Sequence, residues 1–334
     1  MTVKFALLGA GRIGKVHAKA ITSNADARLV TVADAVEAAA TELAAKYGCE
    51  VRSIEDIERS GDIDAVVICT PTDTHADLIE RFARAGKAIF CEKPIDLDLQ
   101  RVKACLKVVE ETGATLMVGF NRRFDPHFKA VHTAITEGKI GAVEMVQIVS
   151  RDPGPPPVSY IRSSGGILRD MTIHDFDMAR FLLGEEPDTV FATASVLIDP
   201  EIAKAGDHDS VSVILTTPSG RHCSISNSRR ATYGYDQRIE VHGSAGAVAA
   251  ENQRPVSIEI ATSAGYTKPP LHDFFMTRYT EAYAAEIATF IAALATGKPA
   301  SPSGQDGLRA LALADAAYLS IREGRAVKVA EVMG

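Results

Sequence analysis

The segment 165–176 carries two side chains whose types and spacing suit acid–base chemistry. Asp170 and His174 lie four residues apart. Residues with this spacing share one face of a helix, so a carboxylate can hold an imidazole in a fixed orientation. An imidazole oriented by a carboxylate is the arrangement that a general base requires. The pair therefore predicts proton transfer to or from a bound substrate.

A helix is expected over residues 167–183. In this helix Asp170, His174 and Asp177 would form a narrow polar stripe, while most other positions are apolar. Polar groups on a largely buried helix must be paired or functional. The alternative to catalysis is a buried His–Asp pair that only pins two domains together, and the N-terminal motif described next favours catalysis.

A dinucleotide-binding signature lies at the N-terminus, in the loop Gly9-Ala10-Gly11-Arg12-Ile13-Gly14. It follows an apolar strand over 3–8, opens a helix, and is followed twenty residues later by Asp34, the context that makes this motif informative. The glycines allow a tight turn, a close approach to pyrophosphate and close helix packing. Asp34 at the end of the second strand favours NAD over NADP, although Arg12 in the loop keeps NADP open. The alternative is a glycine turn with an unrelated surface Asp.

Two further segments follow apolar strands, where a doubly wound sheet places its ligands. They are 69–75, with the sequence CTPTDTH, and 91–94, with the sequence CEKP. A lysine in such a turn is usually solvated. Beside a bound cofactor, Lys93 could instead hydrogen-bond a substrate hydroxyl and stabilise the developing alkoxide. A nicotinamide cofactor and a base together predict that the chain oxidises an alcohol.

The apolar pattern divides the 334 residues into two domains. Apolar strands alternate with helices up to about residue 120, which indicates an α/β, doubly wound parallel sheet of the Rossmann type. After a helix over 126–137, alternating strands follow, which indicates an α+β domain with an open, mostly antiparallel sheet. The strands are expected at 143–150, 189–198, 210–217, 222–228, 236–242 and 256–262, and two last helices at 277–296 and 304–322. The predicted domains are 1–121 and 122–334.

Composition excludes several classes of partner. The formal net charge of −7 argues against general affinity for nucleic acid or an anionic membrane surface. No apolar run approaches the roughly 20 residues that span a bilayer. The five cysteines form no CxxC pair, so neither zinc nor a disulfide framework is expected. A soluble, cytoplasmic protein without a bound metal is predicted.

Nearly the whole chain resembles the glucose–fructose oxidoreductase/inositol dehydrogenase (Gfo/Idh/MocA) family. The matching segments are GAGRIG, CTPTDTH, FCEKPI, the pair Gly165-Gly166 with Asp170 and His174 downstream, and YGYDQRIEVHGSAG. GAGRIG alone is unspecific, whereas Glu92-Lys93-Pro94 combined with the glycine–Asp–His spacing is highly specific. The segments GFNRRFDPHF, SRDPGPPP and RDMTIHDFDMARF are similar to the inositol dehydrogenase branch of the family.

This resemblance implies roles for individual residues. The catalytic group would be Lys93, Asp170 and His174, with His174 as the base. The cofactor-binding residues would be Gly9, Gly11, Arg12, Ile13, Gly14, Asp34, Thr70, Pro71, His75, Glu92 and Lys93. Substrate would be bound by Arg122, Asp152, Asp170, His174 and Tyr235.

The resemblance also implies NAD as cofactor, a small polyol as substrate and a homotetramer formed through the open sheets. The implied reaction is oxidation of myo-inositol to 2-keto-myo-inositol. The alternatives are a relative acting on another inositol isomer, an amino-inositol or an aldose, and a non-catalytic NAD-binding sensor.

Overall fold

The computed structural model describes residues 2–334, which form two compact units. Unit one runs to Phe124 and includes 281–311, whereas unit two contains Asp125–Thr280 and Ala312–Gly334. The sequence predicts a domain boundary at 121–122, with the segment 281–311 in the second domain. In the structure the units divide at 124–125, and this late segment packs with unit one.

Unit one is a six-stranded parallel sheet in the order β3-β2-β1-β4-β5-β6. Its strands are β1 (Val3–Leu8), β2 (Ala27–Ala33), β3 (Glu50–Val51), β4 (Ala65–Ile68), β5 (Ala88–Cys91) and β6 (Leu116–Val118). Its helices are α1 (Arg12–Thr22), α2 (Glu37–Tyr47), α3 (Ile54–Arg59), α4 (His75–Arg84), α5 (Leu99–Thr112), α12 (Thr280–Thr296) and the first part of α13 (Gly304–Glu323). This confirms the predicted doubly wound sheet.

The central strands of this sheet are apolar because both faces are covered. Every residue of β4 is buried, and so are five of the six residues of β1. Helix α12 contributes Phe290, which is fully buried with its ring 6.2 Å from that of Phe5 and 5.9 Å from that of Phe90. This aromatic contact explains why a late segment belongs to the first core.

Unit two is a seven-stranded sheet in the order β12-β11-β7-β10-β9-β8-β15, with only β7 and β10 parallel. Its strands are β7 (Val143–Arg151), β8 (Thr189–Ser195), β9 (Ser210–Thr216), β10 (His222–Ser228), β11 (Asp236–Gly243), β12 (Gly246–Ala250) and β15 (Val327–Lys328). Its helices are α6 (Pro126–Thr136), α7 (Val158–Ser164), α8 (Gly166–Asp170), α9 (Ile173–Leu183), α10 (Pro200–Lys204), α11 (Phe275–Arg278) and α14 (Ala330–Met333). The predicted mostly antiparallel sheet is confirmed.

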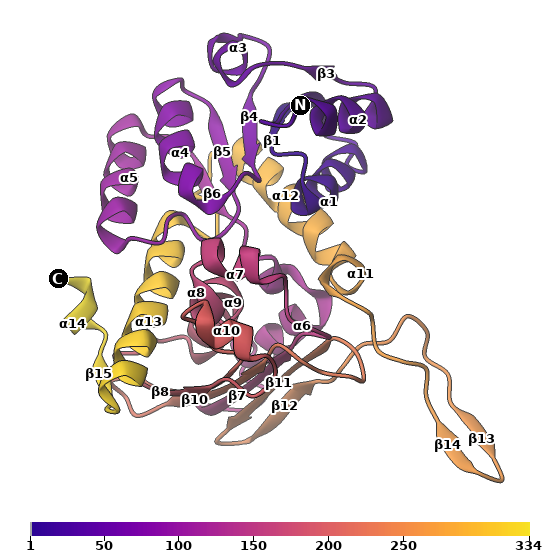
Figure 1. Ribbon diagram of the computed structural model, residues 1–334, viewed down its shortest axis with the longest axis vertical. Coiled ribbons are helices and arrows are strands. Elements are labelled where there is room, and N and C mark those ends of the chain that lie inside the picture. The colour runs from indigo at the N-terminus through magenta and orange to yellow at the C-terminus, as the bar shows by residue number, and fades with distance from the viewer. Residues whose placement is uncertain (1) are drawn as a thin grey trace. The chain divides into compact units, whose positions relative to one another are not determined.

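Alternation along the strands separates two faces of this sheet. In β9, Val211, Val213 and Leu215 are buried, whereas Ser212 and Ile214 are exposed. The buried side chains lie on the side of the sheet where α9 contacts β7 and β10, and the helices α7–α10 all lie on this side (Figure 1). The other face carries Ser, Thr and a few exposed apolar side chains.

The strand predicted over 256–262 is wrong as a member of this sheet. Only β13 (Ile260–Thr262) is extended, and it pairs with β14 (Gly265–Thr267) in a separate hairpin. Figure 1 shows this hairpin extending away from the seven-stranded sheet. The alternating Val256, Ile258 and Ile260 mimic a half-buried strand, but all three side chains are more than half exposed.

Replacing Phe290 with alanine tests whether α12 belongs to the core of unit one. We expect Phe290→Ala to lower the free energy of unfolding by about 3–5 kcal/mol, because a large buried ring leaves a cavity. Thr289→Ala, at an exposed position of the same helix, is the matched control. Urea unfolding measures both variants, and equal stability of the two would contradict this packing.

Candidate active site

The loop after β1 has the backbone geometry of a phosphate-binding turn. Gly9 has φ +99°, and a β-carbon there would lie 2.5 Å from the Cys69 carbonyl oxygen. A β-carbon on Gly14 would lie 1.9 Å from the Gly9 carbonyl oxygen. At Gly11, in contrast, no atom lies within 4 Å of such a position, and no side chain caps the start of α1. The free helix N-terminus beside open space fits a pyrophosphate.

Asp34 supports this loop directly. Its Oδ2 accepts a hydrogen bond of 2.6 Å from the Ala10 amide, and its Oδ1 accepts one of 2.7 Å from the Val36 amide. A carboxylate has about four lone-pair sites, so both oxygens keep capacity for ribose hydroxyls. Asp34 is half-buried at the end of β2. The sequence predicts that the residue at this position hydrogen-bonds the ribose.

His75 connects the two other loops at the same edge of the sheet. Its Nδ1 lies 2.8 Å from the Pro94 carbonyl oxygen, and its Nε2 lies 2.8 Å from that of Thr70. Burial lowers the pKa of His75, although the two carbonyl oxygens oppose this effect. The ring therefore fixes the loop after β4 against the loop that contains Lys93. Pro71 is exposed beside it.

Glu92 and Lys93 differ in their surroundings. The Glu92 side chain points into unit one, where its Oε1 lies 2.6 Å from Nε2 of His17. Lys93 is half-buried at the carboxyl end of β5. Arg122 is buried in the turn Asn121–Phe124 after β6, at the same edge. The structure thus gathers most of the predicted cofactor-binding residues of unit one around adjacent loops.

The single helix predicted over 167–183 is wrong. Helix α8 ends at Asp170 and α9 begins at Ile173. The amides of Met171 and Thr172 both donate to the Ile167 carbonyl oxygen at 2.9 Å, which closes the first helix. The Thr172 hydroxyl donates to Asn227 on β10 at 2.7 Å and anchors the break. The stripe argument therefore does not apply to Asp170 and His174, which lie on successive helices.

Asp170 lies in a polar cluster of unit two that the sequence analysis missed. Its Oδ1 accepts a hydrogen bond of 3.0 Å from the Tyr160 hydroxyl, and its Oδ2 lies 3.6 Å from Nη1 of Arg229. Arg229 is 1% exposed and also lies 3.5 Å from Asp207. Asp207 accepts from the Ile167 amide at 3.0 Å. The signal in the sequence was Arg229, which comes directly after β10 at the next inward position of its alternation.

A second missed cluster lies at the base of α9. Asp175 is fully buried and accepts hydrogen bonds from the Ser150 hydroxyl at 2.6 Å and the Asn227 amide at 2.8 Å. His174, its neighbour, is half-buried. Asp177 pairs with Arg180 at 3.5 Å on the same helix. Asp175 thus holds α9 on the sheet, whereas Asp177 pairs within the helix.

The remaining predicted substrate residues, Asp152 and Tyr235, lie close to the ends of β7 and β11. The Asp152 amide donates to the Ser228 carbonyl oxygen at 2.9 Å. Tyr235 is 5% exposed, and its ring meets those of Phe274 and Tyr279 edge-on, at 5.6 and 6.0 Å. The Tyr235 ring is therefore fixed by packing.

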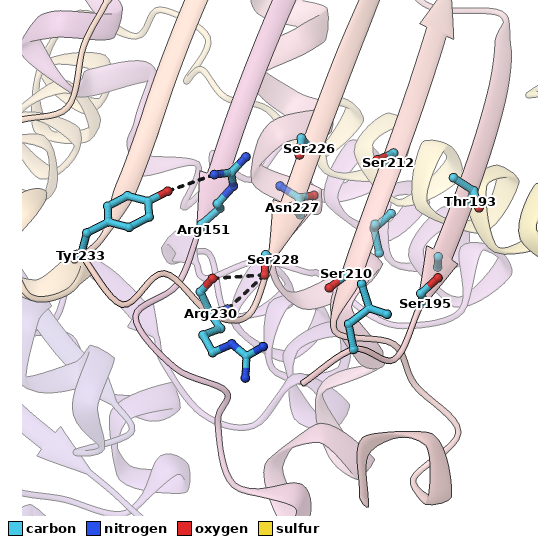
Figure 2. Close-up of a pocket in the computed structure, with 13 residues that line it drawn as sticks. Arg151, Thr193, Ser195, Ser210, Ser212, Ser226, Asn227, Ser228, Arg230 and Tyr233 are labelled. Carbon is cyan, nitrogen blue, oxygen red and sulfur yellow. Dashed lines mark hydrogen bonds between the residues drawn. The ribbon is translucent and has the colours of Figure 1, made fainter. Parts of the chain in front are cut away.

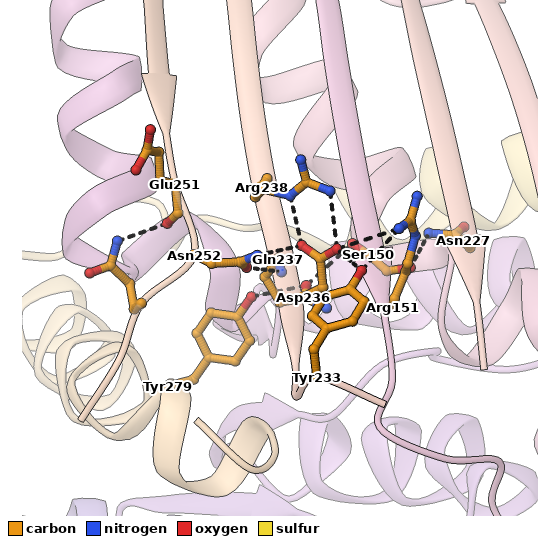
Figure 3. Close-up of polar contacts among 11 residues, drawn as sticks. Ser150, Arg151, Asn227, Tyr233, Asp236, Gln237, Arg238, Glu251, Asn252 and Tyr279 are labelled. Carbon is orange, nitrogen blue, oxygen red and sulfur yellow. Dashed lines mark hydrogen bonds and ion pairs between the residues drawn. The ribbon is translucent and has the colours of Figure 1, made fainter. Parts of the chain in front are cut away.

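Asp236, next to Tyr235, is the centre of a hydrogen-bond network (Figure 3). It accepts from the Tyr233 hydroxyl at 2.6 Å, from Arg238 Nε at 2.7 Å and from the Asn252 amide at 2.7 Å. Burial alone would raise the pKa of Asp236, but these donors outweigh it and hold the pKa below its usual value. The network makes the turn before β11 rigid.

A shallow pocket of about 410 Å³ lies on the helix-free face of the sheet (Figure 2). Hydroxyl groups of β8, β9 and β10 line it together with Arg151 and Tyr233. None of the predicted catalytic or substrate-binding residues lines this pocket. We therefore do not assign the active site to it. A second pocket of about 300 Å³ adjoins Gly165, Gly166 and Asp207.

Comparisons with known proteins agree with the geometry of both units. Residues 3–120 match the oxidoreductase family with an NAD-binding Rossmann fold, and residues 128–249 match the GFO/IDH/MocA C-terminal domain. The chain is 76% identical over 330 residues to inositol 2-dehydrogenase of Rhizobium meliloti, with 99% of this chain and 100% of the relative covered.

Two solved structures have the same fold. A myo-inositol dehydrogenase of Corynebacterium glutamicum superimposes with a TM-score of 0.95 at 44% identity, covering 98% of this chain and 99% of that one. A scyllo-inositol dehydrogenase of Lactobacillus casei, solved with NAD(H) and scyllo-inositol, has a TM-score of 0.92 at 28% identity, covering 99% and 100%.

Unit one is thus an NAD-binding Rossmann domain, and the protein is an NAD-dependent oxidoreductase. The chain belongs to the Gfo/Idh/MocA family. Within residues 2–334, every helix is too short or too polar to cross a bilayer.

Replacing Asp34 tests the basis of cofactor choice. We expect Asp34→Ala to weaken NAD⁺ binding by about tenfold or more, because the predicted ribose contacts and the support of Ala10 would be lost at about 1.5–3 kcal/mol per charged hydrogen bond. The ratio of NADP⁺ to NAD⁺ activity should rise, because the carboxylate no longer repels a 2′-phosphate. Initial rates with each cofactor measure this ratio, and a wild-type preference for NADP⁺ would contradict the role of Asp34.

Proposed function

We propose that the protein oxidises myo-inositol at C2 with NAD⁺, giving 2-keto-myo-inositol (scyllo-inosose) and NADH. The observation that carries this proposal is the 76% identity over the full chain with a protein named inositol 2-dehydrogenase. The scyllo-inositol dehydrogenase among the solved neighbours favours a second candidate, oxidation of another inositol isomer. Amino-inositols and aldoses are further alternatives within the family.

We assign proton transfer to His174. Its neutral imidazole accepts the hydroxyl proton of the substrate. Bound NAD⁺ supplies the hydride acceptor at its nicotinamide ring. Asp170 stabilises the imidazolium by its charge, and Tyr160 and Arg229 hold the Asp170 carboxylate in place. Lys93 donates a hydrogen bond to the oxygen that develops alkoxide character.

Substrate recognition is assigned to polar groups at the strand ends. Arg122, Asp152 and Tyr235, together with Asp170 and His174, would bind the ring hydroxyls. A buried hydroxyl without a partner costs about 1–3 kcal/mol, so a polyol site needs several such groups. The Tyr235 ring and the short loops at the strand ends are already ordered. Their polar groups can therefore bind the ring hydroxyls without a further loss of conformational entropy.

We also propose a cytoplasmic homotetramer assembled through the helix-free sheet face of unit two. Met145, Phe191 and Ile214 are each more than 40% exposed on this face. All five cysteines are free thiols, which suits a reducing compartment. Light scattering tests the assembly: a mass of four 35.6 kDa subunits supports it, and a monomer at micromolar concentration contradicts it.

The substrate assignment predicts a ranking among polyols. With NAD⁺, we expect kcat/KM for myo-inositol to exceed that for scyllo-inositol, chiro-inositol and glucose by about tenfold or more, since each unpaired buried group costs 1–3 kcal/mol. NADH absorbance measures each rate. If another polyol has a higher kcat/KM than myo-inositol, that polyol is the substrate. If no polyol is oxidised, the protein is the non-catalytic NAD-binding sensor.

The proposed base predicts a loss confined to chemistry. His174→Ala should lower kcat by about 10²–10⁴-fold because proton transfer loses its acceptor. The dissociation constant for NAD⁺ should change little, as measured by fluorescence titration. His127→Ala, in which an exposed histidine of α6 is removed, is the matched control. An unchanged kcat in the His174 variant would remove this residue from the mechanism.

The same assignment predicts a pH dependence of oxidation. Only the neutral imidazole accepts a proton, so kcat should rise from mildly acidic to alkaline pH and then level off. In His174→Ala the residual rate should lose this rise. A flat wild-type profile between about pH 5.5 and 9 would exclude a histidine base.

A further inference from the structure

Three buried ionisable side chains of unit one lie together beside the segment that contains Lys93. They are His17 on α1, Glu92 directly after β5 and Glu286 on α12. His17 Nε2 lies 2.6 Å from Glu92 Oε1 and 3.9 Å from Glu286 Oε1. His17 and Glu286 are 0% exposed, and Glu92 is 8% exposed. This buried cluster has no role in the hydride chemistry described above.

The surroundings of the cluster are apolar and aromatic. The rings of Phe90 and Tyr283 lie 5.1 and 5.5 Å from the His17 ring. Cys69 lies close enough to be affected by both carboxyl groups: its thiol pKa is raised first by burial and further by Glu92 and Glu286. A net charge in such surroundings is strongly disfavoured.

The distances and the burial indicate where the protons lie. Among the described residues, neither carboxyl oxygen of Glu286 has a hydrogen-bond partner. Burial raises the pKa of Glu286 well above its usual value, and the nearby Glu92 raises it further. Glu286 is therefore a neutral acid. A neutral His17 and an ionised Glu92 together carry one negative charge. One further proton, held in the 2.6 Å hydrogen bond between them, gives the three groups zero net charge.

Glu92 is also held by close contacts outside the cluster. A β-carbon at Gly119 would lie 3.2–3.3 Å from the carboxyl carbon and both oxygens of Glu92. The Glu92 amide donates to the Ile68 carbonyl oxygen at 3.0 Å. His17 lies on α1, which begins at Arg12 within the glycine loop. The bond between His17 and Glu92 therefore connects the cofactor loop with the residue that precedes Lys93.

A divalent cation is the rival occupant of this cluster, because the three ligand atoms lie within 4.8 Å of one another. Ligand atoms around an octahedral Mg²⁺ with bonds of about 2.1 Å are about 3 Å apart. The 2.6 Å separation of His17 Nε2 and Glu92 Oε1 is shorter and suits a shared proton. The geometry thus favours protons over a cation.

We propose that His17, Glu92 and Glu286 form a neutral, proton-holding cluster that positions Lys93 relative to the cofactor loop. Glu286 keeps its proton, and the His17–Glu92 hydrogen bond holds the start of the lysine loop. These are positioning residues, and their effect on catalysis rests on the proposed function of Lys93.

Infrared spectroscopy of the full-length protein in D₂O tests the protonation state without substrate. We expect the carbonyl stretch of a protonated carboxylic acid to persist between pD 6 and 9 and to vanish in Glu286→Gln. Glu286→Met, of similar volume, replaces the Gln variant if that variant does not fold. Absence of the band, its survival in the folded variant, or one equivalent of divalent metal in the purified protein would overturn the proposal.

Steady-state kinetics tests the positioning role. We expect Glu92→Gln, which keeps the side-chain shape, to lower kcat about 10- to 100-fold through misplacement of Lys93. Because the family resemblance places Glu92 among the cofactor-binding residues, the dissociation constant for NAD⁺ is measured as well, and it should change less than kcat does. Glu110→Gln on the exposed side of α5 is the control. A wild-type kcat, or an equal loss of NAD⁺ affinity, would overturn the positioning role.

The two experiments separate failure of this proposal from failure of the proposed function. If another polyol is the substrate, kcat is measured with that polyol and the comparison is unaffected. If no polyol is oxidised, the proposed function fails and the positioning role fails with it. The infrared result then still decides the protonation state of the cluster.

Discussion

The contact of backbone with backbone at the carboxyl ends of β1 and β4 is the constraint on which unit one depends. Gly9 and Gly14 lie so close to neighbouring carbonyl oxygens that a β-carbon at either position would overlap them. This contact brings the start of α1 to the sheet edge with its amides uncapped. A helix N-terminus favours a pyrophosphate. The cofactor site therefore depends on the absence of a side chain at Gly9 and at Gly14.

The other loops at this edge are held by a few polar contacts rather than by packing alone. Asp34 holds the glycine loop, and His75 connects the loop after β4 to Pro94. The His17–Glu92 bond then connects α1 to the lysine loop. His75, His17 and Glu92 are buried, so the loss of any of their contacts would leave an unpaired buried polar group, which is costly. The loop that carries Lys93 is thus held by hydrogen bonds at both of its neighbours, Glu92 and Pro94.

Local patterns in the sequence predicted most of the fold. Continuous apolar runs identified the parallel strands other than the two-residue β3, and period-two alternation identified β9 and β11, because both patterns reflect which faces are covered. The break between α8 and α9 was not predictable, because it depends on a hydrogen bond from Thr172 to Asn227, 55 residues away. The packing of α12 on unit one likewise depends on a contact between Phe290 and Phe5.

The candidate site was predicted more fully in unit one than in unit two. Gly9, Gly14 and Asp34 are recognised from spacing because their roles are local to one strand–turn–helix. The partners of Asp170 are Tyr160 and Arg229, which come from other elements, and no spacing connects them. The cluster of His17, Glu92 and Glu286 joins residues almost 270 positions apart, beyond the reach of any sequence pattern.

The most direct test of the account is a crystal structure with NADH and myo-inositol bound together. The account predicts that the His174 imidazole hydrogen-bonds the C2 hydroxyl, that Lys93 contacts the same oxygen, and that C2 faces the nicotinamide. A structure with the His174 ring turned away from the inositol, or with the inositol bound apart from Lys93, would contradict it.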